Sequence, residues 1–224
     1  MKNKIQIYII ALSLAVALLI PSVSYAQGGV HLWAIDEIDE ALEEDLVTES
    51  VMVDYQADIT REQFCELVVK VYEKLAETTA EVGDIAFSDT QNEEILKAAK
   101  LGIVNGYGNG VFAPNDLITR EQIATMLVRM IEKAVPYADT GVYNNNTFND
   151  SAMISDWALP SVNFAYDNNI MRGVDNNSID PKANTTCEQA ILLVYRVFDR
   201  YYNYTTIPEG AYELPRVEAP QKNN

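Results

Sequence analysis

Three stretches of the chain share one spacing of apolar residues. In each stretch apolar side chains fall at positions i, i+3, i+4, i+7, i+8 and i+11, which places them on one face of an α-helix. The stripes begin at Phe64, Ile123 and Ala190 and end at Leu75, Ala134 and Tyr201. We therefore predict three long amphipathic helices, over residues 60–75, 119–134 and 186–201.

A capping signal stands at the start of each stripe. The order Thr-x-Glu-Gln begins at Thr60, Thr119 and Thr186, which lie 59 and then 67 residues apart. A Thr that precedes a helix accepts a hydrogen bond from the backbone N–H three residues on, and Gln at that position reaches back to the N–H of the Thr. One structural unit is thus repeated three times, and the repeat governs the fold.

A shorter helix is predicted upstream of each long one. Its apolar positions are Trp33, Ile38, Ala41 and Leu46 in unit one, Ile95, Ala98 and Ile103 in unit two, and Trp157, Val162, Ala165 and Ile170 in unit three. We assign the two tryptophans to the core. Since no unit buries its own apolar face, we predict one mainly α-helical domain at 27–204, with helix-pair units at about 31–77, 85–135 and 146–204. The units are expected to pack with pseudo-threefold symmetry around a shared core of the three long helices.

Glycine-rich turns join the two helices of units two and three. Residues 106–114 run Gly-Tyr-Gly-Asn-Gly-Val-Phe-Ala-Pro and align without a gap with residues 173–181. Such glycines indicate backbone at positive φ or closely approached by another group. Unit one has a shorter segment without glycine, so its turn must differ.

The two ends of the chain are expected to lie outside this domain. Residues 1–26 read as a signal peptide, with two lysines, an apolar run from Ile5 to Ile20 and the small-residue motif Ser24-Tyr25-Ala26. A retained membrane anchor is the less favoured alternative, because it needs about 20 apolar residues. Residues 205–224 have no helical period and are expected to form a flexible tail.

Charge and composition exclude several functions. The formal net charge of −17 disfavours nucleic acid and anionic lipid as partners. The single histidine, His31, has no evident partner and is assigned to the surface; no His/Cys spacing predicts a metal site. We therefore expect no enzyme activity, no metal and no cofactor. Cys65 and Cys187 are expected to be free thiols, with a bridge between them as the alternative.

The motifs together resemble the S-layer homology repeat of bacterial surface proteins. Unit two carries the resemblance over its whole length, through Phe87-Ser88-Asp89, Gly102-Ile103-Val104-Asn105-Gly106, Gly110-Val111-Phe112-Ala113-Pro114 and Ile118-Thr119-Arg120-Glu121. Unit three matches at Phe148-Asn149-Asp150, Trp157-Ala158 and Ile170-Met171-Arg172-Gly173 but has Cys187 where the family has Arg. Unit one keeps Trp33-Ala34 and Ile59-Thr60-Arg61-Glu62.

The resemblance implies a secreted monomer at the cell surface of a Gram-positive bacterium. Proteins of this family anchor to secondary cell-wall polysaccharide, commonly through a pyruvylated sugar. A helical-repeat scaffold that binds another protein is the alternative, and it would not need Arg at the helix starts.

The residues suggest how an anionic sugar would be held. A helix start offers unpaired N–H groups and partial positive charge, and Arg at the first helical position adds a fork of donors for a carboxylate. The best candidate site is Arg120 with the turn glycines Gly106, Gly108 and Gly110, and Arg61 is second. The remaining candidates are Thr60, Thr119, Gly173, and the acidic residues Glu121, Asp89 and Asp150, which could bind the hydroxyls of a sugar. Cys187 lacks the charge, so fewer than three pockets are expected to be filled. In the alternative interpretation the boxes only cap helices and the arginines are solvated or paired with a local acid.

Overall fold

The computed structural model describes residues 29–84, 87–142 and 146–202, and in these residues it contains six α-helices and only isolated β-bridges. Three helices are short: α2 (Ile35–Glu43), α4 (Glu93–Lys100) and α6 (Leu159–Asp167). Three are long: α3 (Arg61–Leu75), α5 (Arg120–Ala134) and α7 (Cys187–Tyr201). Short 3₁₀ turns lie at Glu49–Val51, Ser151–Met153 and Asp175–Asn177. The mainly α fold is confirmed, whereas the predicted leader at 1–26 and tail at 205–224 lie outside the described residues.

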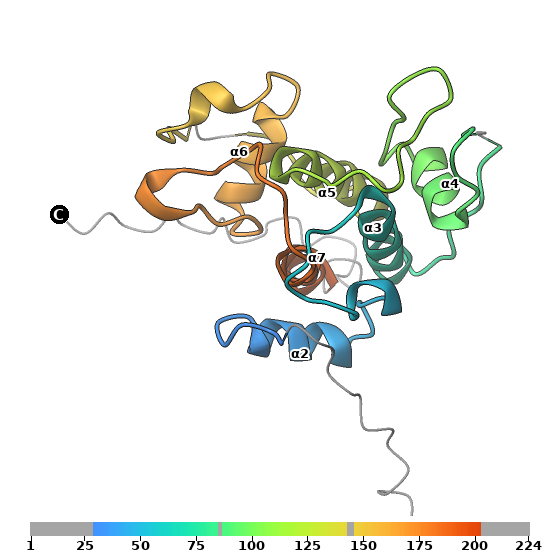
Figure 1. Cartoon of the computed structure of the whole chain (residues 1–224), viewed down its shortest axis with the longest axis horizontal. Helices are drawn as coiled ribbons and strands as arrows, with labels where there is room; N and C mark the ends of the chain where they lie inside the picture. Colours follow the sequence, from blue (N-terminus) through green and yellow to red (C-terminus); the bar gives the residue numbers. More distant parts are fainter. Residues whose placement is uncertain (1–28, 85–86, 143–145, 203–224) are drawn as a thin grey trace, which may run out of the picture.

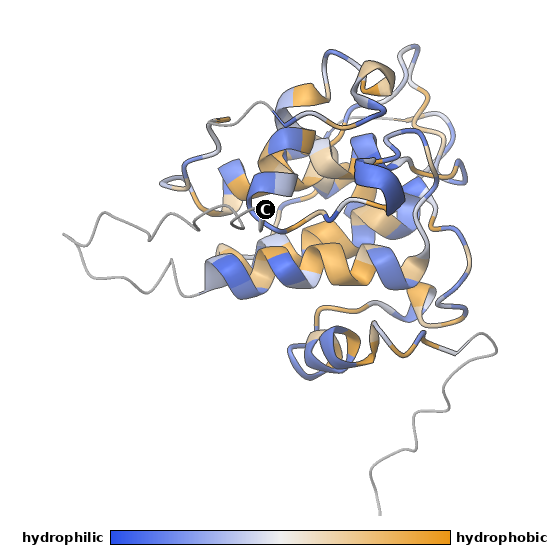
Figure 2. Cartoon of the chain, turned by 90° about the vertical axis from the view of Figure 1, so that its left-hand side faces the viewer, coloured by the Kyte–Doolittle hydropathy of each residue, from blue (hydrophilic) through white to orange (hydrophobic). Residues whose placement is uncertain are grey.

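The three long helices form a shared core. Every residue of the predicted stripes is buried, and Leu67, Leu127 and Val194 have no exposed surface. The helices α3, α5 and α7 contact one another pairwise, and at the start of all three the predicted Gln side chain accepts from the backbone N–H of the capping Thr. Figure 2 shows both apolar and polar positions on the helices, as amphipathic packing requires. Truncating a stripe leucine to alanine would cost about 2–5 kcal/mol in such a core.

Each short helix packs on the long helix of the preceding unit. The pairs are α4 on α3, α6 on α5 and α2 on α7. Figure 1 shows the result, in which α2, α4 and α6 form three lobes around the central α3, α5 and α7. The packed helix pairs therefore cross from one unit to the next, and the pairing of α2 with α7 closes the chain into a ring.

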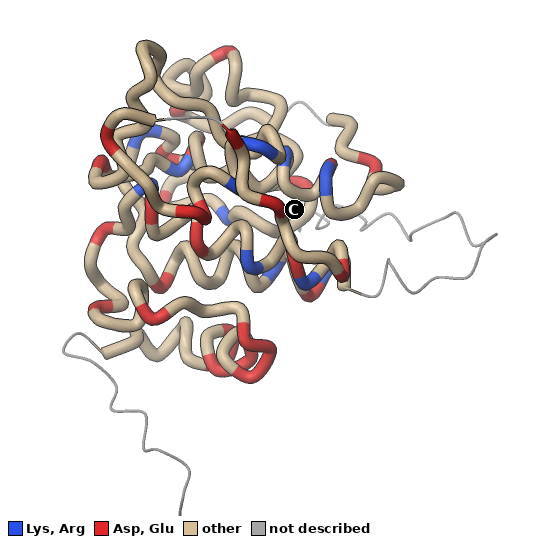
Figure 3. Tube along the Cα trace, turned by 90° about the vertical axis from the view of Figure 1, so that its right-hand side faces the viewer, with Lys and Arg blue, Asp and Glu red and all other residues tan. Residues whose placement is uncertain are grey.

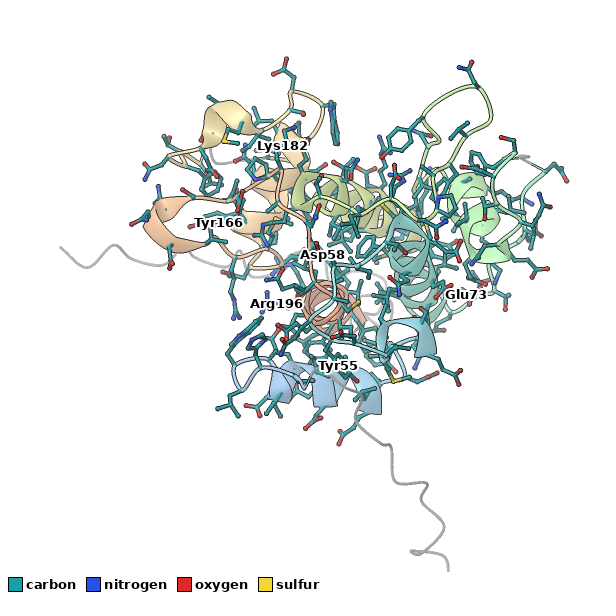
Figure 4. The ribbon with its side chains drawn as sticks, in the orientation of Figure 1. Tyr55, Asp58, Glu73, Tyr166, Lys182 and Arg196 are labelled. Carbon is teal, nitrogen blue, oxygen red and sulfur yellow. The ribbon has the colours of Figure 1, made fainter. Side chains whose placement is uncertain are left out.

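Polar contacts hold the ring closed between α2 and α7. The Arg196 guanidinium donates to both carboxylate oxygens of Glu37, at 2.6 and 3.0 Å, and the Tyr195 hydroxyl donates to Glu40 at 2.5 Å. The buried Tyr55 lies between α7 and α2, and Arg196 belongs to α7 (Figure 4). The first and last units are thereby joined as closely as units that follow one another in sequence.

The segments that precede the long helices meet at the centre of the ring. Isolated bridges join Asp58 to Thr186, Thr60 to Leu117 and Thr119 to Asn184. In the middle lie Ile59, Ile118 and Thr185, none with exposed surface; the N–H of Ile118 donates to Ile59 and that of Ile59 to Thr185. The Thr185 hydroxyl has no hydrogen-bond partner in the described structure. A polar group thus occupies a central position that the other two units fill with isoleucine.

Charge is distributed unevenly over the three lobes. No Lys or Arg occurs between Lys4 and Arg61, so Asp and Glu are the charged residues of that stretch. Figure 3 shows these acidic residues on the α2 lobe, while lysines and arginines lie on the other parts of the domain. His31 is the only side chain in the stretch that can become positive near neutral pH.

Candidate functional site

The start of each long helix lies against the loop of the next unit. The first two N–H groups of each helix donate to backbone carbonyls of that loop, at 2.8–3.1 Å. The carbonyls are those of Asp116 and Pro114 over α3, Ala183 and Pro181 over α5, and Ala57 and Tyr55 over α7. We name these contacts the first, second and third junctions, at the starts of α3, α5 and α7 respectively. The three junctions are equivalent in their backbone geometry.

The free helix N-terminus predicted as an anion site is not present at these junctions. Loop carbonyls accept from the first two N–H groups of each helix. At α3 and α7 the side chains of Thr60 and Thr186 accept from the N–H of the third helical residue. A helix start offers an anion site only through N–H groups that have no other partner. That part of the sequence-based hypothesis is wrong.

The two helix-start arginines reach into the turn of the next unit. Arg61 donates from Nε to the carbonyl of Phe112 and from Nη2 to that of Asn105, both at 3.2 Å. Its guanidinium lies 4.5 Å from the ring centroid of Tyr107 and 4.6 Å from that of Phe112, which adds cation–π attraction. Arg120 donates in the same way to the carbonyls of Ile179 and Arg172, both at 2.8 Å. Each arginine therefore holds a turn in place.

The structure corrects both the alternative interpretation of these arginines and the expected site around Arg120. They are neither solvated nor bonded to a local acid: Arg120 is 8% exposed and its donors meet backbone carbonyls. Burial lowers the pKa of Arg120, and the nearby Asp180 and Asp150 oppose that shift. Arg120 also does not join the Gly106 turn, because the arginine at that turn is Arg61. Each Arg belongs to the glycine turn of the following unit.

The turns need glycine where two backbone segments approach each other closely. Gly106 and Gly173 precede short hydrogen bonds, from Tyr107 to Val111 at 2.8 Å and from Val174 to Ser178 at 2.7 Å. A Cβ on Gly106 would lie 2.6 Å from the carbonyl oxygen of Val111. Gly108 and Gly110 are needed for a different reason, since both adopt positive φ, +95° and +73°.

Asp89 and Asp150 brace these turns. The carboxylate of Asp89 accepts from the N–H groups of Phe112 at 3.0 Å and Ala113 at 2.7 Å. Asp150 accepts in the same way from Ile179 and Asp180. The hydrogen bonds from Phe112 and Ala113 lower the pKa of Asp89. Both residues were predicted as candidates to bind ligand hydroxyls, and in the structure their oxygens hold the chain.

The third junction departs from the other two in both of its parts. Unit one lacks the glycine turn, and Cys187 stands where Arg would reach into it. Both differences lie at this junction, where Cys187 replaces the Arg that holds the turn at the other two. Cys187 is buried and its pKa is raised to about 11 by burial, so the thiol is neutral. Cys65 is also buried, and both thiols are free, as expected.

A buried glutamate follows the first helical residue at the second and third junctions. Glu121 accepts from the N–H of Ser155 at 2.9 Å and from its hydroxyl at 3.0 Å, and Lys182 Nζ pairs with the same carboxylate. Glu188 accepts from the N–H of His31 at 3.1 Å and lies 2.6 Å from its Nδ1. His31, expected to have no partner, is thus paired with a buried carboxylate.

The two tryptophans are exposed, contrary to the sequence-based prediction. Trp33 and Trp157 are 59% and 56% exposed, and each follows by two residues the partner of a buried glutamate, His31 or Ser155. The His31 and Trp33 rings stack with centroids 6.1 Å apart. Their neighbours Ala34 and Ala158 are the residues that enter the core. The apolar spacing gave the right helix but could not tell its first buried residue from the residue before it.

Comparison with known proteins identifies the repeat. The family model of the S-layer homology domain matches residues 84–124 and 147–191, which lie in units two and three. This chain is an S-layer homology domain protein. The family model does not cover unit one, which nevertheless supplies a helix pair, a capping box and a junction of the same geometry.

Relatives with different names share this region. The chain is 32% identical over 186 residues to an endoglucanase of Bacillus sp. (strain KSM-635), covering 78% of this chain and 19% of the relative. It is 30% identical over 174 residues to an amylopullulanase of Thermoanaerobacterium thermosulfurigenes, covering 76% and 9%. It is 32% identical over 121 residues to a surface layer protein of Brevibacillus choshinensis, covering 53% and 10%. The chain thus spans less than a fifth of the length of each.

S-layer homology domains are in general modules that attach bacterial surface proteins to the cell wall, and they are not catalytic. Within the described ranges no group of three or more His, Cys, Asp or Glu side chains is arranged to hold a metal ion. No helix in that part of the chain is long and apolar enough to span a membrane.

Proposed function

We propose that this domain anchors non-covalently to secondary cell-wall polysaccharide by binding a pyruvylated sugar at the junctions between units. The protein would act as a secreted monomer at the surface of a Gram-positive bacterium. The observation that carries the proposal is an exposed tryptophan two residues after the partner of a buried glutamate. Trp157 follows Ser155, which binds Glu121 together with Lys182, and Trp33 follows His31, which binds Glu188.

The chemistry of the second junction suits an anionic sugar. An exposed tryptophan presents an apolar face with a polar tip, which fits the face of a pyranose ring. Lys182 is half-exposed and bonds to Ser155 Oγ at 2.6 Å as well as to Glu121, so its ammonium is fixed beside α5 and α6 (Figure 4). This one fixed ammonium can bind the single carboxylate of a pyruvyl ketal. Such a site suits a strongly acidic protein, which has few cationic side chains to offer.

The helix-start arginines take a supporting role in this proposal. Arg61 and Arg120 hold the turns that border the first and second junctions, together with the glycines and with Asp89 and Asp150. The ligand itself would contact Trp157 and Lys182. Thr60 and Thr119 stand at the starts of the helices from which the junctions are built, and their backbone N–H groups donate to Gln63 and Gln122.

The identity of the ligand is tested by pull-down on purified cell-wall sacculi. Sacculi freed of protein are compared with the same sacculi after mild acid removal of the pyruvate ketals. We expect binding to the first and background retention on the second. Equal retention on both would show that the ketal is not the ligand.

The location of the site is tested with Trp157→Ala and Lys182→Gln. Each should weaken retention on sacculi roughly tenfold or more, the loss expected for a charge-assisted contact or a stacked ring. Tyr137→Ala is the matched control, because Tyr137 is 85% exposed and follows the far end of α5. Circular dichroism and thermal unfolding verify that each variant is folded. If all three variants bind alike, the second junction is not the site.

The exposed apolar residues near both tryptophans favour one alternative, a surface that binds another protein. Leu32 is exposed beside Trp33, and Met153 and Leu159 are exposed near Trp157. Retention on sacculi stripped of protein separates the two functions. A wall-binding module is retained on the bare polysaccharide, whereas a protein-binding scaffold is retained only when the partner is present.

A further inference from the structure

The helix α2 is held by the last unit of the chain. Ile38 and Ala41 are its buried residues, and the helix packs on α7 (Figure 1). Side-chain contacts with unit three reinforce this packing, and they join Glu37 to Arg196, Glu40 to Tyr195 and His31 to Glu188. The segment that contains α2 is therefore attached to unit three, although it belongs to unit one in sequence.

The chain that follows α2 is attached to a different helix. Lys70 of α3 donates to the carbonyl of Val47 at 3.2 Å. The hydroxyl of Ser50 donates to Glu66, also on α3, at 2.5 Å. The boundary between the part held by α7 and the part held by α3 thus falls at residues 44–46.

The turn at this boundary has the properties of a hinge. Asp45 adopts a φ of +52°, and the N–H of Leu46 closes the turn on the carbonyl of Ala41 at 2.9 Å. The equivalent turns after α4 and α6 have Gly102 and Asn169 at this position, with φ of +75° and +56°. Glycine adopts such backbone freely, whereas a residue with a side chain stores strain there. A short hinge under strain favours exchange of the element that it carries.

We propose that two copies of this chain exchange α2, so that α2 of each copy packs on α7 of the other. Residues 47–60 stay with α3 and α7 of their own copy, and whatever precedes α2 moves with it. Both rings are closed in the resulting two-fold symmetric dimer. The contacts between α2 and α7 are the same as in the monomer, so relief of strain in two turns opposes the entropy cost of joining two molecules.

The dimer should form at high protein concentration. A short linker holds α2 near its own α7 at an effective concentration that is roughly millimolar, and a second copy has to compete with it. The inference goes beyond the proposed function, which concerns one domain, and it does not depend on the ligand. A dimer would carry two wall-binding domains, which bind a repetitive polysaccharide more tightly than one.

Exchange is tested with two variants that complement each other but not themselves. In Glu37→Arg two arginines meet between α2 and α7, and in Arg196→Glu two glutamates meet there. In an exchanged dimer with one copy of each variant, both contacts contain opposite charges. The matched control is the double variant Glu37→Arg/Arg196→Glu, which carries the reversed pair within one chain.

The two variants are unfolded in urea and refolded as an equal mixture, and their mass is measured by size-exclusion chromatography with light scattering. We expect dimers that contain one copy of each variant, at concentrations at which each variant alone and the double variant stay monomeric. Two restored ion pairs with charge-assisted hydrogen bonds should lower the dimer dissociation constant roughly a hundredfold or more relative to the parent.

A mixture that stays monomeric while the double variant folds would overturn the inference. A dimer that each variant forms equally well alone would also overturn it, because that dimer does not use the contact between α2 and α7. If the double variant does not fold, the parent decides at about 1 mM. Isotope-filtered NOEs from α2 of a labelled copy to α7 of an unlabelled copy are then expected, and their absence would reject exchange. None of these measurements uses the wall, so failure leaves the proposed function intact.

Discussion

At the scale of single residues, the chain places its key side chains across the boundary between units. Arg61 and Arg120 donate to carbonyls in the turn of the following unit. Glu188, in unit three, binds His31 at the start of unit one. The sequence could predict which residues are special, because a capping box and a repeated Arg are local patterns. It could not predict their partners, since a motif fixes the position of a side chain on its helix and says nothing of what packs above it.

Thr185→Val should stabilise the domain. Thr185 is fully buried at the centre of the ring, its hydroxyl has no partner, and Ile59 and Ile118 fill the equivalent positions. Removing an unpaired buried hydroxyl while keeping the shape should add about 1–2 kcal/mol to the free energy of unfolding. Urea denaturation measures the change. A loss of stability would mean that the hydroxyl is hydrogen-bonded in solution.

Arg120→Ala should destabilise the fold, contrary to what an exposed helix-start Arg would do. The change removes two hydrogen bonds from a charged group and leaves the carbonyls of Ile179 and Arg172 unpaired. The expected cost is on the order of 2–3 kcal/mol. Arg172→Ala is the control, because that side chain is 66% exposed and its loss should cost no more than about 1 kcal/mol. Equal effects of the two changes would contradict the structural role of Arg120.

At the scale of elements, helix existence and helix partnership have different origins. The spacing of apolar residues and the capping boxes predicted all six helices, because both are local. The long helix on which a short helix packs depends on loop length and on the apolar faces of all six helices. The packing of short helices on the long helix of the neighbouring unit was therefore not predictable from periodicity. The glycine turns were predicted as special backbone, and their braces, Asp89 and Asp150, were assigned to a ligand.

The turn of unit two should loosen in acid. Hydrogen bonds from Phe112 and Ala113 lower the pKa of Asp89 in the folded state. A carboxyl group whose pKa is lower in the folded state stabilises the fold above its unfolded pKa and loses that contribution as the pH falls through the folded value. Amide hydrogen exchange of Phe112 and Ala113 should therefore accelerate below about pH 4, beyond the intrinsic pH dependence. In Asp89→Asn the added acid sensitivity should disappear, and its persistence would assign it to another group.

At the scale of the whole molecule, the domain is one ring with its first and last units joined. The packing of α2 on α7 and the pairing of Arg196 with Glu37 close it. Because its helix pairs are formed between neighbouring units, the ring should unfold as one cooperative unit. Trp33 and Trp157 lie in different lobes, so urea unfolding followed by fluorescence in Trp33→Phe and Trp157→Phe should give transitions that coincide with circular dichroism of the same variant. Separate transitions would show that the units fold independently.

The central claim is that the junctions marked by exposed tryptophan bind the cell wall. The most direct measurement is the equilibrium binding of the intact chain to protein-free sacculi. The Trp33→Ala/Trp157→Ala double variant is compared with the parent and with Tyr137→Ala. The account predicts that the folded double variant falls to background while Tyr137→Ala binds as the parent does. Undiminished binding of the double variant would contradict it.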